Sequence, residues 1–190
     1  MIMLYIDDDI ESLDWDKLIT RIPQQRRGKI MSLRNERDRR LGLAAYMLLC
    51  EALAVEYGIE AMPHFAYYEG GKPFIADRPD ICFSLSHCRK GAACVVDYAP
   101  VGVDMETIRR YNPELARRVL SDEELAVVES SVRPDIEFIR LWTMKESYLK
   151  MTGEGIRSDL KKVPLSTAAF ETTVNTARGY VCTVCRGMRE

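Results

Sequence analysis

Residues 92–105, AACVVDYAPVGVDM, form the stretch that decides the fold class. Ala92–Val96 and Val101–Met105 are short apolar runs rich in valine, as strands are, and Asp97-Tyr98-Ala99-Pro100 between them has the composition of a loop. Two strands therefore follow each other without a helix between them. Because a doubly wound parallel sheet requires strands and helices to alternate, this order of elements favours the α+β class.

Outward from this stretch, helices and strands are predicted on both sides. The longest helix is expected over residues 31–57, where apolar residues recur at three- and four-residue steps and Gly58 provides the end. A second long helix should begin at Asp135 and end before Gly153. Shorter helices are expected over residues 14–22, from Asn112-Pro113 and from the capping box Ser121-Asp122-Glu123-Glu124, and further strands over residues 1–6, 81–85, 170–174 and 180–185.

The composition argues against several classes of function. The 190-residue chain has 27 Lys+Arg against 29 Asp+Glu, a formal net charge of −2, whereas a nucleic-acid binder is expected to have a basic face. No run approaches the ~20 uninterrupted apolar residues of a membrane span. The run Asp7-Asp8-Asp9 is acidic where a signal peptide would be basic. We therefore expect a cytoplasmic protein that binds neither nucleic acid nor a membrane.

The cysteines are expected to be reduced. There are six of them, an even number that disulfides could use, but a chain of this size without a secretory signal is more typical of a reducing compartment. Cys182 and Cys185 have the spacing of redox and zinc sites. However, they lie in the strand-like run 180–185, and a zinc site needs a second pair of ligands. We predict that both pack as small apolar side chains.

Asp104 and Glu106 occupy alternate positions at the end of the strand-like run Val101-Gly102-Val103. The two-residue period of a strand places both carboxylates on one face, where they repel each other unless they share a cation or a proton. Mg²⁺ suits paired carboxylates and completes its shell with water and phosphate oxygens. Taken alone, such a pair is more commonly a solvated acidic turn.

A further acidic candidate lies in the second long helix. Glu146 and Lys150 are four residues apart and are therefore neighbours on one helical face, and Trp142 lies one turn earlier on the same side. A surface ion pair is one explanation, but the tryptophan indicates a face that is not uniformly exposed to solvent. In the other explanation, Lys150 binds a phosphate while Glu146 reaches a metal or a proton.

Ser86 and His87 follow the apolar run Ile81-Cys82-Phe83. A histidine at the end of a strand can hydrogen-bond a phosphate or transfer protons. By itself such a histidine is more often structural or simply exposed. The segment therefore indicates a site only in combination with the carboxylates.

Taken in order, these motifs resemble those of the Sfp-type 4′-phosphopantetheinyl transferases, which move 4′-phosphopantetheine from coenzyme A to a serine of a carrier protein. The resemblance covers most of the chain, and four ordered motifs are far more specific than any one of them. Ser84, where the family usually has asparagine, and Cys88 depart from the pattern. The matching segments are Gly71-Lys72-Pro73-Phe74, Phe83-Ser84-Leu85-Ser86-His87, Val101-Gly102-Val103-Asp104-Met105-Glu106, Trp142-Thr143-Met144-Lys145-Glu146-Ser147 with Lys150, and Gly153-Glu154-Gly155-Ile156.

The resemblance implies a fold and a set of residue roles. Two pseudo-symmetric α+β halves should pack around one cleft, residues 1–99 contacting the nucleotide of coenzyme A and residues 100–190 holding the metal site and the carrier. The implied enzyme depends on Mg²⁺ and acts on coenzyme A and an apo acyl or peptidyl carrier protein. Lys145 should only support the site, since one helical step turns it about 100° from Glu146. The implied metal ligands are Asp104, Glu106 and Glu146, the catalytic residues Glu146 and Lys150, and the coenzyme A contacts Arg40, Lys72, Ser86, His87 and Lys150.

Three alternatives remain open. The small holo-(acyl-carrier-protein) synthases share the acidic motif and the Lys-Glu helix, but they are shorter chains that form trimers with sites between subunits. Both sets of motifs lie in one longer chain here, which favours a monomer. A non-catalytic coenzyme A-binding or carrier-docking protein with a decayed site is disfavoured because all three carboxylates and Lys150 are present. A simple interaction domain would require four ordered matches to be coincidental.

Carrier proteins of this kind are generally acidic along the helix that follows the modified serine. The docking surface should therefore be locally basic despite the net charge of −2. Two basic clusters are candidates, and solvated loops are the simpler explanation of both. The first contains Arg109, Arg110, Arg117 and Arg118, and the second contains Arg157, Lys161 and Lys162.

Overall fold

The computed structural model of the chain describes residues 3–155 and 159–187. The first elements are strand β1 (Leu4–Asp7), helices α1 (Trp15–Ile19), α2 (Gln24–Met31) and α3 (Glu36–Tyr57), and strands β2 (Phe65–Tyr67), β3 (Pro73–Ile75), β4 (Cys82–Cys88) and β5 (Gly91–Asp97). They are followed by strand β6 (Val101–Thr107), helices α4 (Pro113–Val119), α5 (Asp122–Ser130) and α6 (Pro134–Thr152), and strands β7 (Ala168–Asn175) and β8 (Tyr180–Gly187). This mixture confirms the predicted α+β class.

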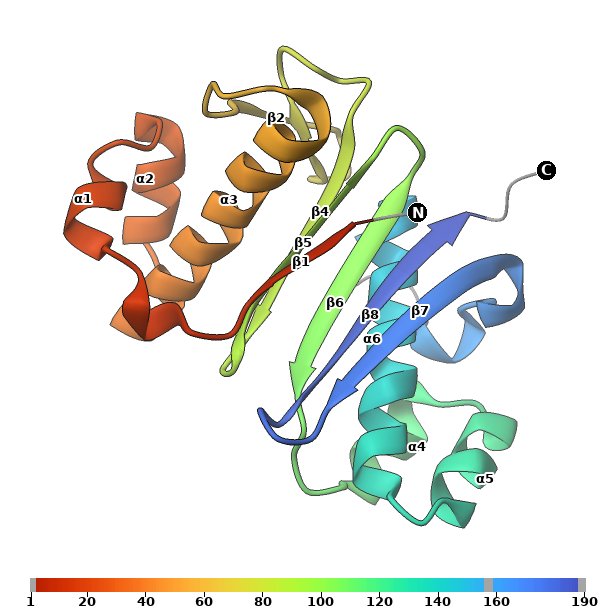
Figure 1. Cartoon of the computed structure of the whole chain (residues 1–190). Helices are drawn as coiled ribbons and strands as arrows, with labels where there is room; N and C mark the ends of the chain where they lie inside the picture. The colour runs from red at the N-terminus through yellow and green to blue at the C-terminus, as the bar shows by residue number, and fades with distance from the viewer. Residues whose placement is uncertain (1–2, 156–158, 188–190) are drawn as a thin grey trace.

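The chain contains one arrangement of sheet and long helix twice (Figure 1). In the first, β1, α3, β4 and β5 occur in this order along the chain, with shorter elements between them. The three strands form an antiparallel sheet of order β1-β5-β4. In the second, β6, α6, β7 and β8 follow one another and form an antiparallel sheet of order β6-β8-β7. Residues 98–100 connect the two sheets. The exact division into residues 1–99 and 100–190 stays a prediction.

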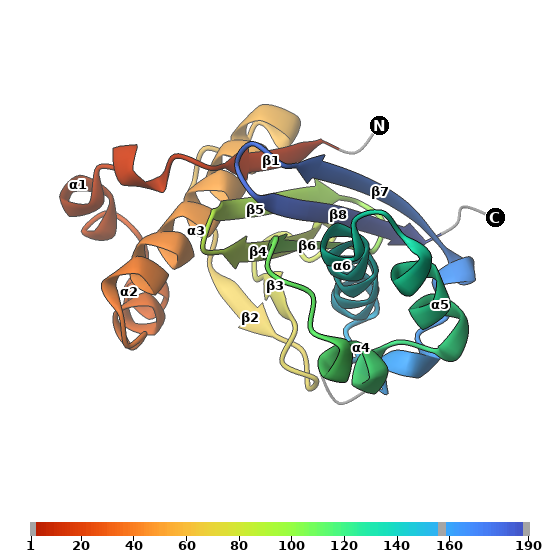
Figure 2. The ribbon, with the colours of Figure 1, turned by 90° about the horizontal axis from the view of Figure 1, so that it is seen from below.

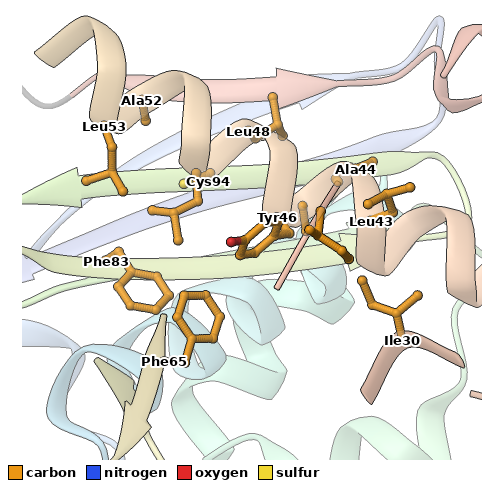
Figure 3. Close-up of a cluster of buried hydrophobic side chains, with 14 of the residues drawn as sticks. Ile30, Leu43, Ala44, Tyr46, Leu48, Ala52, Leu53, Phe65, Phe83 and Cys94 are labelled. Atoms are coloured by element: carbon orange, nitrogen blue, oxygen red, sulfur yellow. The ribbon is translucent and has the colours of Figure 1, made fainter. Parts of the chain in front are cut away.

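Strand β5 is buried on both faces, which explains its unbroken apolar run. Its even-numbered residues pack against α3 in a first core, and its odd-numbered residues pack against β6 in a second core between the sheets. Figure 3 shows Cys94 of β5 together with Leu48 and Leu53 of α3 in the first core. A third core joins α4, α5 and α6 to β8. The two sheets are therefore enclosed by α3 on one side and α6 on the other (Figure 2).

Two serines of β4 form hydrogen bonds to β6, a strand of the other sheet, and so join the two sheets. Ser84 Oγ accepts a hydrogen bond from Val103 N at 3.0 Å, and Ser86 Oγ accepts one from Met105 N at 3.1 Å. Both serines are buried. Side-chain oxygens thus satisfy backbone N–H groups of β6 at the seam between the two halves.

Replacing Ser84 with alanine should lower the free energy of unfolding by about 1–3 kcal/mol, because the buried Val103 N–H would lose its acceptor. Urea unfolding followed by circular dichroism measures this change. Ser130→Ala is the matched control, since Ser130 is exposed and its hydroxyl bonds only within its own helix. Equal stability of Ser84→Ala and the control would contradict the role of Ser84 at the seam.

The helix predicted over residues 31–57 is wrong at its beginning. Helix α2 ends at Met31, and α3 begins only at Glu36. Asn35 between them has extended backbone angles (φ −109°, ψ 153°), and its side chain accepts a hydrogen bond from Asp38 N, which fixes the start of α3. The predicted end is confirmed, because Gly58 has φ 66° and terminates α3.

Within the described residues, no helix is both long and apolar enough to cross a membrane.

The hairpin formed by β2 and β3 was not predicted, because each strand has only three residues. In the turn between them, Gly71 adopts φ 82°. The capping box at the start of α5 is confirmed, with Ser121 and Glu124 each bonding the backbone of the other.

Six cysteines are present as free thiols. Cys182 lies in the core between the sheets, whereas Cys185 Sγ is 3.7 Å from Met151 Sδ of α6. Because the two cysteines are three residues apart in a strand, their side chains lie on opposite faces of β8. The prediction that they pack as apolar side chains is confirmed.

Candidate active site

Strand β6 presents Gly102 and Asp104 to helix α6. The odd-numbered residues of the strand pack between the sheets, so its even-numbered residues face the other way. A Cβ on Gly102 would overlap the carbonyl oxygen of Ser147 and would lie 2.7 Å from Met151 N. Strand and helix therefore touch backbone to backbone, and this close approach brings Asp104 against Lys150.

Asp104 and Lys150 form an ion pair at the centre of the site, with side chains that are 7% and 31% exposed. Lys150 Nζ donates to Asp104 Oδ1 at 2.7 Å, to Ser86 Oγ at 2.9 Å and to Val103 O at 3.1 Å. Ser86 Oγ lies 2.9 Å from the same carboxylate oxygen and donates to it. The second oxygen, Asp104 Oδ2, is buried and has no hydrogen-bond partner among the described residues.

Glu106 and Glu146 add two carboxylates near Asp104. Burial raises the pKa of both glutamates, the negative charge of Asp104 raises it further, and Lys150 opposes this rise. These shifts have the signs expected when like charges share a poorly solvated space. Asp104 therefore acts electrostatically on both glutamates.

The donor set fits a hard divalent cation in its chemistry. Within the described ranges, no three Asp, Glu, His or Cys side chains lie close enough together to form a finished metal site. Nevertheless, the charge of Asp104 acts on both glutamates, and its own Oδ2 is buried without a hydrogen-bond partner in the described part of the chain. Carboxylate oxygens are the ligands that Mg²⁺ prefers in proteins.

Two cavities adjoin these carboxylates. The first has a volume of about 340 Å³ and is lined by Glu146 and Lys150 together with apolar residues such as Phe83 and Leu149. The second has a volume of about 410 Å³, and most of the residues that line it are charged or polar. Its lining residues are Asp38, Leu41, His87, Cys88, Arg89, Glu106, Thr107 and Arg109.

Lys72 and His87 lie in different cavities. Lys72 lines the first, and its Nζ donates to Met151 O at 2.6 Å near the end of α6. Burial lowers the pKa of Lys72. His87 lines the second cavity. Desolvation lowers the pKa of its imidazole, and the positive charge of Lys150 lowers it further. This shift favours the neutral ring, which both donates and accepts hydrogen bonds.

Two other predicted coenzyme A contacts have partners within the protein. The Ser86 hydroxyl bonds Asp104, Lys150 and the backbone of β6. Arg40 has other partners: its Nε is 3.3 Å from Glu36 Oε1, and its guanidinium carbon is 5.9 Å from the centre of the Trp15 ring. The role of Arg40 toward coenzyme A stays a prediction.

Arg109 is a site residue that the motifs did not reveal. It lines the second cavity with Glu106, and its charge lowers the pKa of that glutamate. Arg109 follows the last residue of β6 by two positions, where no strand or helix period fixes the direction of a side chain. The sequence therefore offered only its charge as a signal.

The other described residues of the two basic clusters predicted for carrier docking are exposed. Arg110, Arg117 and Arg118 are exposed, and in the described part of the chain their side chains form no ion pair. Lys161 is also exposed, whereas Lys162 Nζ is 3.5 Å from Asp159. Arg157 and Ile156 lie outside the described residues.

Comparison with known proteins gives one answer. Residues 100–185 match the 4′-phosphopantetheinyl transferase superfamily. A 4′-phosphopantetheinyl transferase of Bacillus subtilis is 31% identical over 157 residues, which cover 80% of this chain and 70% of the relative. The 4′-phosphopantetheinyl transferase Sfp of Bacillus subtilis strain 168 is 28% identical over the same shares of both chains.

A solved structure also matches in part. The holo-[acyl-carrier-protein] synthase of Thermotoga maritima aligns with a TM-score of 0.41 and 18% identity, over 48% of this chain and 65% of that one.

The identity to the first Bacillus relative extends over most of both chains. The chain belongs to the Sfp-type 4′-phosphopantetheinyl transferases.

Proposed function

We propose that this transferase moves the 4′-phosphopantetheine arm of coenzyme A to a carrier serine at the site where β6 contacts α6. The observation that supports this location is the group around Asp104: a buried carboxylate with one unpartnered oxygen, two further carboxylates, and the ammonium group of Lys150. Such a group suits a diphosphate that arrives with a divalent cation.

Asp104, Glu106 and Glu146 would hold Mg²⁺. When bound there, the ion would supply positive charge that stabilises the charge developing on the diphosphate. Lys150 would exchange its contact with Asp104 for a phosphate oxygen and so orient the diphosphate as a point charge. Positioning of this kind accounts for most of the catalysis in phosphoryl transfer.

Glu146 would act as the general base, directly or through a water. It accepts the proton of the carrier serine hydroxyl as the serine oxygen bonds to the phosphorus that bears the pantetheine arm. The bond from that phosphorus to the bridging oxygen breaks, and adenosine 3′,5′-bisphosphate leaves with the electron pair. Glu146 borders the first cavity beside Lys150, so its carboxylate adjoins the space proposed for coenzyme A.

The two cavities suit the two ends of the nucleotide. The first has apolar walls and glycines 70 and 71, which suit the base, with Lys72 at its side. The second is lined by His87, Arg89 and Arg109, which suit phosphate. Ser86 would serve the nucleotide only indirectly, through the orientation of Asp104 and Lys150.

Intact-protein mass spectrometry tests the proposed activity. Apo carriers of the fatty-acid, polyketide and nonribosomal-peptide types are incubated with the enzyme, coenzyme A and Mg²⁺. We expect at least one carrier to gain the mass of one phosphopantetheine arm. Coenzyme A binding without any mass gain on all three carrier types would support a non-catalytic binding protein instead.

The carrier would dock on the basic face of α4, where Arg117 and Arg118 are exposed. This surface belongs to the same half of the chain as the carboxylates, and its charge complements an acidic carrier helix. Helix α4 alone supplies two exposed cations that form no ion pair in the described structure.

Reversing both charges, Arg117→Glu with Arg118→Glu, should raise the KM for the carrier about tenfold while leaving the KM for coenzyme A unchanged. Steady-state kinetics with each substrate varied in turn measure this. Arg21→Glu is the matched control, because Arg21 is exposed and follows α1, a helix that lies on the opposite side of the molecule from α4 (Figure 1). An unchanged carrier KM in the double variant would remove α4 from the docking surface.

We also propose that the protein is a monomer in the cytoplasm. All the proposed site residues come from one chain, so no second copy is needed to complete the site. Free cysteines in the cores suit a reducing compartment. Size-exclusion chromatography would show a single-chain mass, whereas a trimer would indicate sites shared between subunits.

A further inference from the structure

Lys145 is a buried cation that the proposed reaction does not use. It directly precedes Glu146 on α6, yet only 1% of its side chain is exposed. Its Nζ is 2.8 Å from Glu124 Oε1 and donates to Leu160 O at 2.7 Å. The ammonium group therefore points away from Asp104 and into the contact between α6, α5 and the segment around Leu160.

Glu124 is itself fixed by the first turn of α5. Its Oε2 accepts a hydrogen bond from Ser121 N at 2.8 Å, and its own backbone N donates to Ser121 Oγ at 3.3 Å. Its side chain is only 18% exposed. One oxygen of the carboxylate thus caps α5 and the other binds Lys145, so the start of α5 holds the lysine in a single place.

This contact restricts the rotation of α6. Neighbouring side chains on a helix are about 100° apart, so the direction of Lys145 determines the direction of Glu146. On the opposite side, Lys150 binds Asp104, Ser86 and the carbonyl of Val103, and Thr143 Oγ1 lies 2.7 Å from Thr183 Oγ1, so side-chain bonds also hold α6 against the sheets. Lys145 adds two bonds on the side of α5, so α6 is held from both sides.

The contact with Leu160 joins the same lysine to a second segment. Leu160 begins the helical turn Leu160–Lys162, and its carbonyl accepts the hydrogen bond from Lys145 Nζ. The lysine therefore ties this turn as well as α5 to α6.

From these contacts we infer that Lys145 is a positioning residue: through Glu124 and Leu160 it sets the direction in which Glu146 reaches the metal and the carrier serine. The inference rests on the proposed role of Glu146. Lys145 would act only through its contacts with Glu124 and Leu160, and the capping box of α5 would thereby help to support the active site.

The test uses Lys145→Met, Glu124→Leu and the double variant. Each single variant leaves one buried charge without its partner and should lower the melting temperature. The double variant removes both charges and should recover much of that stability. Lys161→Met, a substitution of an exposed lysine in the same region, is the control.

The informative quantity is the Mg²⁺ concentration that gives half-maximal transfer, together with the Mg²⁺ dissociation constant from calorimetry without carrier. We expect both to rise about tenfold in Lys145→Met and to remain raised in the double variant, with the KM for coenzyme A at saturating Mg²⁺ unchanged. If Lys145 only stabilises the fold, both values return to those of the wild type in the double variant, which would overturn the inference. A wild-type protein that binds no Mg²⁺ or transfers no arm would instead refute the proposed function itself.

Discussion

Glu146→Gln should lower the rate of phosphopantetheine transfer by about 10²–10⁴-fold, the contribution typical of a positioned general base. The amide keeps the shape of the side chain but can neither accept the proton nor bind a divalent ion as a carboxylate does. The fold should remain intact or become more stable, because the substitution removes one of the charges that repel Asp104. Carrier modification followed by mass spectrometry measures the rate, and thermal unfolding measures the stability.

The control for this variant is Glu129→Gln. Glu129 is an exposed glutamate of α5, outside the cavities of the proposed site, and its loss should leave the rate unchanged. A Glu146→Gln enzyme that transfers as fast as the control would remove Glu146 from the mechanism, whatever its effect on stability.

Gly102→Ala should destabilise the protein by more than about 3 kcal/mol, the upper end of typical overpacking costs. The added Cβ would overlap a backbone carbonyl of α6 and approach Met151 N to 2.7 Å, and backbone atoms cannot rotate away as a side chain can. Helix α6 would have to move off β6. That movement would separate Lys150 from Asp104 and would also reduce transfer under conditions where the protein still folds.

Gly28→Ala is the matched control for this substitution. A Cβ on Gly28 meets nothing within 4 Å, and the residue lies in α2, where alanine is favoured over glycine by roughly 0.5–1 kcal/mol. Urea unfolding of the two variants should therefore give shifts of opposite sign. A Gly102→Ala protein as stable as the wild type would contradict the backbone contact between β6 and α6.

The elements with strong local signals were predictable. Strands β5 and β6 have continuous apolar runs, and Asn112, Ser121, Gly58 and Gly153 mark helix ends by their side-chain or backbone chemistry. The break between α2 and α3 was missed because Asn35 lies inside a pattern that otherwise continues as a helix. The hairpin of β2 and β3 was missed because its strands are too short for a period to show.

The site was predictable in composition but not in its contacts. The motif order indicated Asp104, Glu106, Glu146 and Lys150, whereas the pairing of Lys150 with Asp104 depends on how closely β6 approaches α6. Likewise, nothing in the sequence showed that Ser84 would bond the backbone of β6. Contacts between elements distant in sequence depend on packing, which residue spacing along one element cannot reveal.

The central claim is that a divalent cation and coenzyme A meet at Asp104 between the two halves. Calorimetric titration with coenzyme A, with and without Mg²⁺, on the wild type and Asp104→Asn tests it most directly. We predict that Mg²⁺ strengthens the binding of coenzyme A to the wild type at least tenfold and has no such effect on the variant. Equal strengthening by Mg²⁺ in both proteins would contradict the claim.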